Sequence, residues 1–290
     1  MLLKKIILLS CALSLFFFCS PLFSLWAEDK VEHALKRMTT EEQCALDCFF
    51  RYILLHEQGI YVFEGTKPAA WAGFTKPTHY LCNFFFWRPL NMAVLLKRGY
   101  ETWQKYQHLF PLEKYALLFH EEDDHLHIFF LNRKCFLAKI TEHLKDFRAV
   151  LGQDVTPQSL FKKLENKEIS SLEALMRNDK LMGLLLGFGY HNSSLFQEKI
   201  AFQRQVESGS LIPKSAEYIA NELDKAEAKL HFPLRESKLY LSALPCYLFD
   251  PTDAETQALK TQYSEQRKKL AAAYKGHRFF QTTLKELTSK

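Results

Sequence analysis

The sequence predicts an α+β fold, in the form of a helix-dominated single domain with a small antiparallel sheet. Segments 115–120 and 125–132, joined by the acidic turn 121–124, are typical of a β-hairpin. After residue 132 most of the chain shows helical periodicity and capping residues. Strands and helices do not alternate regularly, which argues against a doubly wound nucleotide-binding sheet.

The first predicted helix begins at a capping box formed by Thr40 and Gln43, and Gly59 ends it. Segment 60–64 alternates between apolar and polar residues and is expected to be a strand. A turn is expected at 65–68, where glycine and proline lie close together.

The next region, 71–83, is rich in aromatic residues and is expected to be irregular. A helix is expected from Pro89 to about His108, and Pro111 lies just beyond it. The predicted hairpin then follows.

The rest of the chain is predicted to be mostly helical, because each segment begins at a capping residue or a proline. The expected helices run from Asn132 to Leu151, from Thr156-Pro157 onward, from Ser171 to Arg177, from Asn178 or Asp179 to the glycines at 187 and 189, from Asn192 or Ser193 to about Glu207, and from Pro213 to Leu230.

The C-terminal segment contains one more expected strand, 239–249, bent at Pro245. A long helix with a Thr252/Glu255 capping box and a stop at Gly276 is expected after it. A short amphipathic helix from Phe279 to Leu287 is expected to close the chain.

Residues 1–27 have the composition of an export signal. Lys4 and Lys5 precede an uncharged, mostly apolar run that ends at Ala27. We expect cleavage after Ala27, which leaves 28–290 as one globular domain. The alternatives are an uncleaved N-terminal anchor, since the run is just long enough to span a bilayer, and lipidation at Cys11.

Composition narrows the possible partners. The net charge of +5 is spread along the chain, whereas a nucleic-acid-binding face requires clustered basic residues. No apolar run after residue 30 reaches spanning length. We therefore expect no nucleic-acid partner, and membrane contact only through the N-terminal segment if it stays uncleaved.

The histidines of the predicted hairpin are a candidate metal site. His125 and His127 share one face of a strand, and His120 lies across the turn. Three imidazoles beside carboxylates suit zinc. The interpretation we favour is that the strand's apolar residues enter the core and the histidines face water, so that no metal binds.

A glycine-rich corner is a candidate ligand or partner site. Gly187 and Gly189 precede His191 and Asn192, and the amides of the predicted Asn192 helix would suit an anion. A tight corner with a helix cap explains the same residues. The glycines follow a helix and lack the third glycine of a dinucleotide fingerprint, so we expect no cofactor.

Lys67 is a further candidate binding residue, because it lies in the turn after the predicted strand 60–64. The spacing of a phosphate-binding loop is absent, and turn geometry alone explains the sequence there.

Several short strings resemble an uncharacterised family of predicted exported proteins from intracellular bacteria. The resemblance covers most of the chain after the signal and implies a stand-alone domain with an export signal, but no activity. The strings are Tyr61–Pro68, Gly99–Trp103, Phe110-Pro111, Leu184–Gly189, Asn192, Leu195-Phe196, Leu244-Pro245, Asp250-Pro251, Glu255-Thr256 and Tyr274–Gly276.

The function that the sequence favours is an exported, non-catalytic binding or envelope-associated protein with a protein or small-molecule partner. The chain has no Gly-x-Ser-x-Gly nucleophile elbow. A hydrolase whose histidine and carboxylate groups meet only in the folded chain is one alternative. Metal binding by the 120–127 hairpin is the other.

Overall fold

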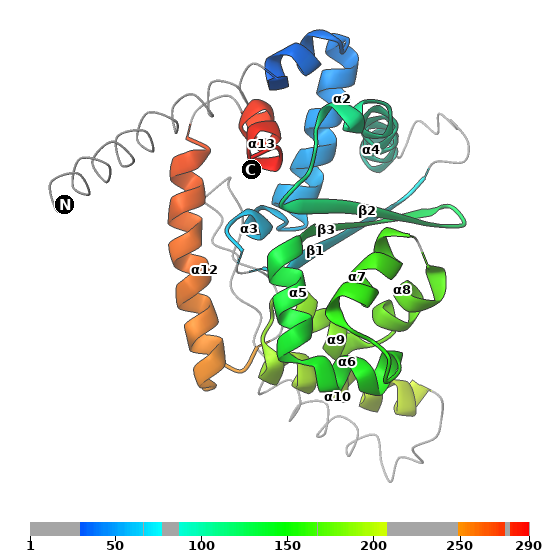
Figure 1. The fold of residues 1–290 in the computed structure, drawn as a ribbon, viewed down its shortest axis with the longest axis vertical. Coiled ribbons are helices and arrows are strands. Elements are labelled where there is room, and N and C mark those ends of the chain that lie inside the picture. Colours follow the sequence, from blue (N-terminus) through cyan, green and yellow to red (C-terminus); the bar gives the residue numbers. More distant parts are fainter. Residues whose placement is uncertain are drawn as a thin grey trace, which may run out of the picture.

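The computed structural model describes residues 30–65, 67–76, 87–166, 168–207, 249–275 and 279–289. Its centre is a three-stranded antiparallel sheet with helices on both faces (Figure 1). The predicted α+β class is confirmed. The predicted signal segment 1–27, the expected helix 213–230 and all but the last residue of the expected strand 239–249 lie outside the described residues.

The sheet has the order β1-β3-β2. The predicted hairpin is confirmed as β2 (Tyr115–Glu122) and β3 (His125–Asn132). Strand β2 is two residues longer than expected, so that the turn is 123–124 and not 121–124. Strand β1 (Ala69–Thr75) pairs with the other edge of β3. The expectation that 71–83 is irregular was therefore wrong for its first residues. Alanine and glycine give β1 little strand propensity, so its pairing with a distant strand decides its structure.

Alternate residues of the strands point to opposite faces of the sheet. On the first face, Ile128 and Phe130 of β3 are buried against the N-terminal helices and the last two helices. The elements of this core are α2 (Thr40–Arg51), η1 (Tyr52–His56), α3 (Ile60–Phe63), α4 (Trp87–Tyr106), η2 (Gln107–Leu109), α12 (Ala254–Ala273) and α13 (Phe279–Leu287). The expected helices near 89–108 and 279–287 are thus present.

Two local predictions in this core were wrong. The capping box of α2 is formed by Thr39 and Glu42, one residue earlier than expected. Residues 60–63 form α3 and not a strand. All four of its side chains are buried, and a short apolar run buried on every side cannot be assigned by periodicity.

The second face of the sheet packs against a group of shorter helices (Figure 1). These are α5 (Arg133–Glu142), α6 (Leu144–Leu151), α7 (Pro157–Glu165), α8 (Ile169–Met176) and α9 (Asp179–Leu185), followed by α10 (Tyr190–Glu207). Asn132 caps α5 as predicted, because its side chain accepts a hydrogen bond from the Cys135 amide. The expected continuous helix to Leu151 is divided at His143.

The starts of α10 and α12 differ from the predictions. Helix α10 begins at Tyr190, so Asn192 lies inside it and is not its cap. Helix α12 is capped by Asp253, whose carboxylate accepts from the Thr256 amide, and not by the expected Thr252/Glu255 box. Within the described ranges, none of the helices is long and apolar enough to cross a membrane.

Candidate functional site

The glycine corner between α9 and α10 requires glycine at two positions. Gly187 and Gly189 have φ values of +78° and +84°, in the left-handed region that other residues rarely occupy. Gly183, one turn earlier, allows α10 to approach closely: a Cβ there would lie 2.5 Å from the Ser193 hydroxyl oxygen. The glycines therefore allow the backbone of this corner to pack closely against neighbouring residues.

The backbone amides at the start of α10 bind an anion that the chain itself supplies. One carboxylate oxygen of Glu255 accepts from the Tyr190 amide at 2.9 Å, and the other accepts from the His191 amide at 3.0 Å. This carboxylate takes the position that we predicted for an anionic ligand or partner. Such an arrangement is favourable at a helix N-terminus.

Asn192 and His191 connect this corner to the entry of α12. Asn192 is buried and donates to the Phe188 carbonyl (3.0 Å) and the Thr256 hydroxyl (2.8 Å). Its side-chain oxygen accepts from the Asp250 amide at 2.9 Å. The His191 ring lies 3.2 Å from the Asp250 carboxylate.

If His191 were the histidine of a hydrolase site, Asp250 would be its carboxylate partner. Hydrogen bonds from the hydroxyl and then the amide of Thr252 lower the pKa of Asp250 to about 2, and His191 contributes further. Asp250 thus stays ionised and orders the turn before α12. These contacts account for the His191–Asp250 pair as a structural part of the junction between α10 and α12.

Lys67, a separate candidate in the sequence, lies at the same junction. A Cβ at Gly187 would lie 3.3 Å from the Lys67 Cα. The Lys67 side chain is only 3 % exposed. Burial lowers its pKa to about 8, while the charge of Glu57 acts in the opposite direction. Among the described residues, none forms a hydrogen bond or ion pair with its ammonium group.

The hairpin histidines form a row on the second face of the sheet. The ring centroids of His120 and His127 are 6.1 Å apart, and those of His125 and His127 are 5.2 Å apart. Trp71 on β1 donates its indole N–H to Nδ1 of His127 at 3.3 Å. Burial is the main cause that lowers the pKa of His127.

The structure differs from our expectation for the row at His120. Ile128 and its alternate neighbours enter the core as predicted, but His120 is only 7 % exposed and does not face water. A metal site would need three grouped ligands. Within the described ranges, no three His, Cys, Asp or Glu side chains are grouped in a way that could hold a metal ion.

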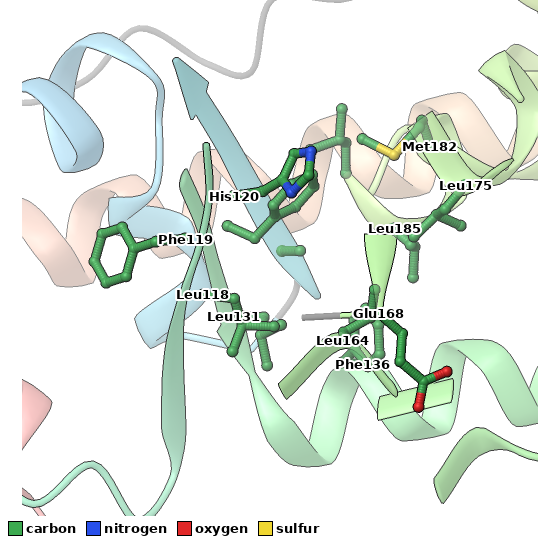
Figure 2. Close-up of a pocket in the computed structure, with 13 residues that line it drawn as sticks. Leu118, Phe119, His120, Leu131, Phe136, Leu164, Glu168, Leu175, Met182 and Leu185 are labelled. Atoms are coloured by element: carbon green, nitrogen blue, oxygen red, sulfur yellow. The ribbon is translucent and has the colours of Figure 1, made fainter. Parts of the chain in front are cut away.

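An apolar cavity of about 20 Å³ lies beside His120, between the sheet and α5, α7, α8 and α9 (Figure 2). Its walls are apolar except for His120 and Glu168. The lining residues are Ala69, Leu118, Phe119, His120, Phe129, Leu131, Phe136, Leu164, Glu168, Leu175, Met182, Leu185 and Leu186.

The two polar residues of the lining differ in their surroundings. His120 projects from β2 among the apolar side chains, whereas Glu168 lies at the opposite end of the lining (Figure 2). Glu168 is exposed and His120 is buried. Neither ring nitrogen of His120 hydrogen-bonds to another described residue. A buried imidazole with both nitrogens available is rare in an apolar wall, because buried polar groups are normally paired.

Comparison with known proteins adds no further constraint. No family model, curated protein or solved structure matches the chain. The site must therefore be interpreted from its own geometry.

The sequence pattern does contain part of the cavity lining, since strand alternation puts Leu118 and His120 on one face. The helical wall has no comparable local signal, because it is assembled from four separate helices.

Proposed function

We propose that the chain is an exported, non-catalytic binding protein for a small apolar ligand, held between the sheet and helices α7–α9. The cavity beside His120 is the observation that supports this proposal. Ligand pockets are lined mostly by apolar side chains, with a few placed polar groups that fix orientation. Eleven of the thirteen lining residues are apolar, and His120 is the buried polar group among them.

The size of the cavity limits how a ligand enters. A volume of about 20 Å³ accommodates a group no larger than about one water molecule. A longer ligand must therefore displace side chains of α8 and α9. Met182 is suited to such movement, because methionine is unbranched and adapts to irregular space. We expect the helical wall to move while the sheet, which is paired along all of β3, stays in place.

Filling the cavity tests this proposal. The Leu118→Phe variant adds an aromatic ring on the cavity side of β2, whereas Leu117→Phe adds the same ring on the opposite face of the strand. Both positions are half-buried. We expect the variant at 118 to bind a neutral long-chain alcohol at least about tenfold more weakly than the unmodified chain. The variant at 117 should bind with unchanged affinity.

Isothermal titration calorimetry gives the affinity and stoichiometry, and circular dichroism confirms that both variants fold. Equal affinity of the two variants, or the absence of 1:1 binding to the unmodified chain, would contradict a ligand site at this cavity.

Export is the second part of the proposal and rests on residues 1–27, which lie outside the described residues. A basic start, an apolar run and a small residue before the first acidic residues are typical of a cleaved signal. We expect the protein in the cell-envelope or secreted fraction to begin at Glu28. N-terminal sequencing of that material decides the point, and an intact Met1 on cytosolic protein would contradict export.

A further inference from the structure

We infer that His120 is the recognition residue for a carboxylate, so that the ligand is an apolar carboxylic acid with its chain along the apolar wall. The inference rests on the proposed function, because it assigns the ligand class of the same cavity. Its structural basis is the position of His120: more than nine-tenths buried, on the lining of the cavity, with no hydrogen bond to another described residue.

Hydrogen bonding separates His120 from the other two histidines of the row. Nδ1 of His127 accepts from Trp71, and its Nε2 lies 3.6 Å from the Glu122 carboxylate. Nδ1 of His125 lies 3.1 Å from the Thr75 hydroxyl. Both rings are therefore already engaged within the sheet. His120 is the member of the row whose nitrogens are available to a ligand in the cavity.

A carboxylate is the group that best matches a buried imidazole. A protonated imidazole carries a charge, and a charge in largely apolar surroundings is stabilised by a paired counter-ion. A ligand carboxylate supplies this counter-ion together with a charge-assisted hydrogen bond. An alcohol can bond the ring but cannot balance its charge.

The carboxylates already near the row do not fill this role. Glu122 is 57 % exposed and contacts His127. Glu121 is bound by Lys76 at 2.6 Å and by the Tyr100 hydroxyl at 3.0 Å. Glu168 is exposed at the other end of the lining. Exposed charges are screened strongly by water, so these carboxylates interact only weakly with a group inside the cavity.

The inference predicts how the affinity for each class of ligand changes with pH. A carboxylate binds a protonated imidazole more strongly than a neutral one, so the affinity of a carboxylate ligand should rise as the pH falls. The affinity for a neutral alcohol should not rise, because protonation then leaves the charge of the ring without a counter-ion.

The experiment compares dodecanoate with dodecanol, which have the same chain, by calorimetry at about pH 8 and about pH 6. On the unmodified chain, we expect the ratio of acid affinity to alcohol affinity to increase by about tenfold at the lower pH. His120→Phe keeps a ring of similar size and should abolish this increase. His120→Gln serves the same purpose if the phenylalanine variant does not fold, and His125→Gln is the control that should keep the increase.

The outcomes separate the two proposals. Alcohol and acid affinities that respond equally to pH, or an increase that persists without the His120 ring, would overturn the carboxylate assignment and leave the apolar site intact. Failure of both compounds to bind would overturn the proposed function together with this inference.

Discussion

Replacing Gly187 with valine is expected to reduce the free energy of unfolding by about 2–5 kcal/mol, a large part of the margin of an ordinary domain. The first reason is conformational. The φ value of +78° brings any Cβ close to a carbonyl oxygen and costs about 1–2 kcal/mol.

Packing adds a second penalty at Gly187. A Cβ there collides with the hydroxyl of Tyr263, which donates a 2.9 Å hydrogen bond to the Gly187 carbonyl. It would also lie 3.3 Å from the Lys67 Cα, which is backbone and cannot rotate away. Forcing extra atoms into such a contact costs about 1–3 kcal/mol.

Gly65→Val is the matched control, because Gly65 has nearly the same φ value, +80°. Its nearest neighbour would be the Cys135 sulfur at 3.2 Å, at the end of a side chain. We expect a loss of only about 1–2 kcal/mol there. Urea unfolding of the two variants and the unmodified chain measures the difference. Equal losses would show that the Gly187 junction is loosely packed.

Local signals in the sequence identified the elements whose structure depends on near neighbours. The hairpin around 123–124, the Asn132 cap and the start of α7 at Thr156-Pro157 were all predicted correctly. Each depends on residues within one turn of the chain. Strand β1 was missed, because it is stabilised by pairing with residues fifty or more positions away.

At the candidate sites, too, the sequence did not indicate contacts between distant segments. Turn chemistry made Gly187 and Lys67 two separate candidates in the sequence, and the structure brings their backbones together. It did not indicate that Glu255, from the distant helix α12, binds the amides of α10. Nor did it show that α7, α8 and α9 would bury His120 and turn a surface histidine into the polar group of a cavity.

The Lys67→Met variant is expected to be more stable than the unmodified chain at neutral pH, by about 1–3 kcal/mol. Methionine keeps a flexible apolar chain in the buried position and removes an ammonium that forms no hydrogen bond or ion pair with another described residue. Lys268→Met, at an exposed position on α12, is the control and should change stability by less than about 0.5 kcal/mol.

The pH dependence of this gain follows from the pKa of Lys67. Burial lowers it from the ordinary 10.5 to about 8, so between these pH values the unfolded chain holds a proton that the folded chain has lost. Stability of the unmodified chain relative to the variant therefore rises with pH across this window. The advantage of Lys67→Met should be complete below about pH 8 and should disappear toward about pH 10.5.

Urea unfolding of both chains at several pH values measures the advantage directly. A variant that is less stable at neutral pH would show that the Lys67 ammonium is compensated by a partner. In that case the lysine would be a binding group of the junction, as the sequence first suggested.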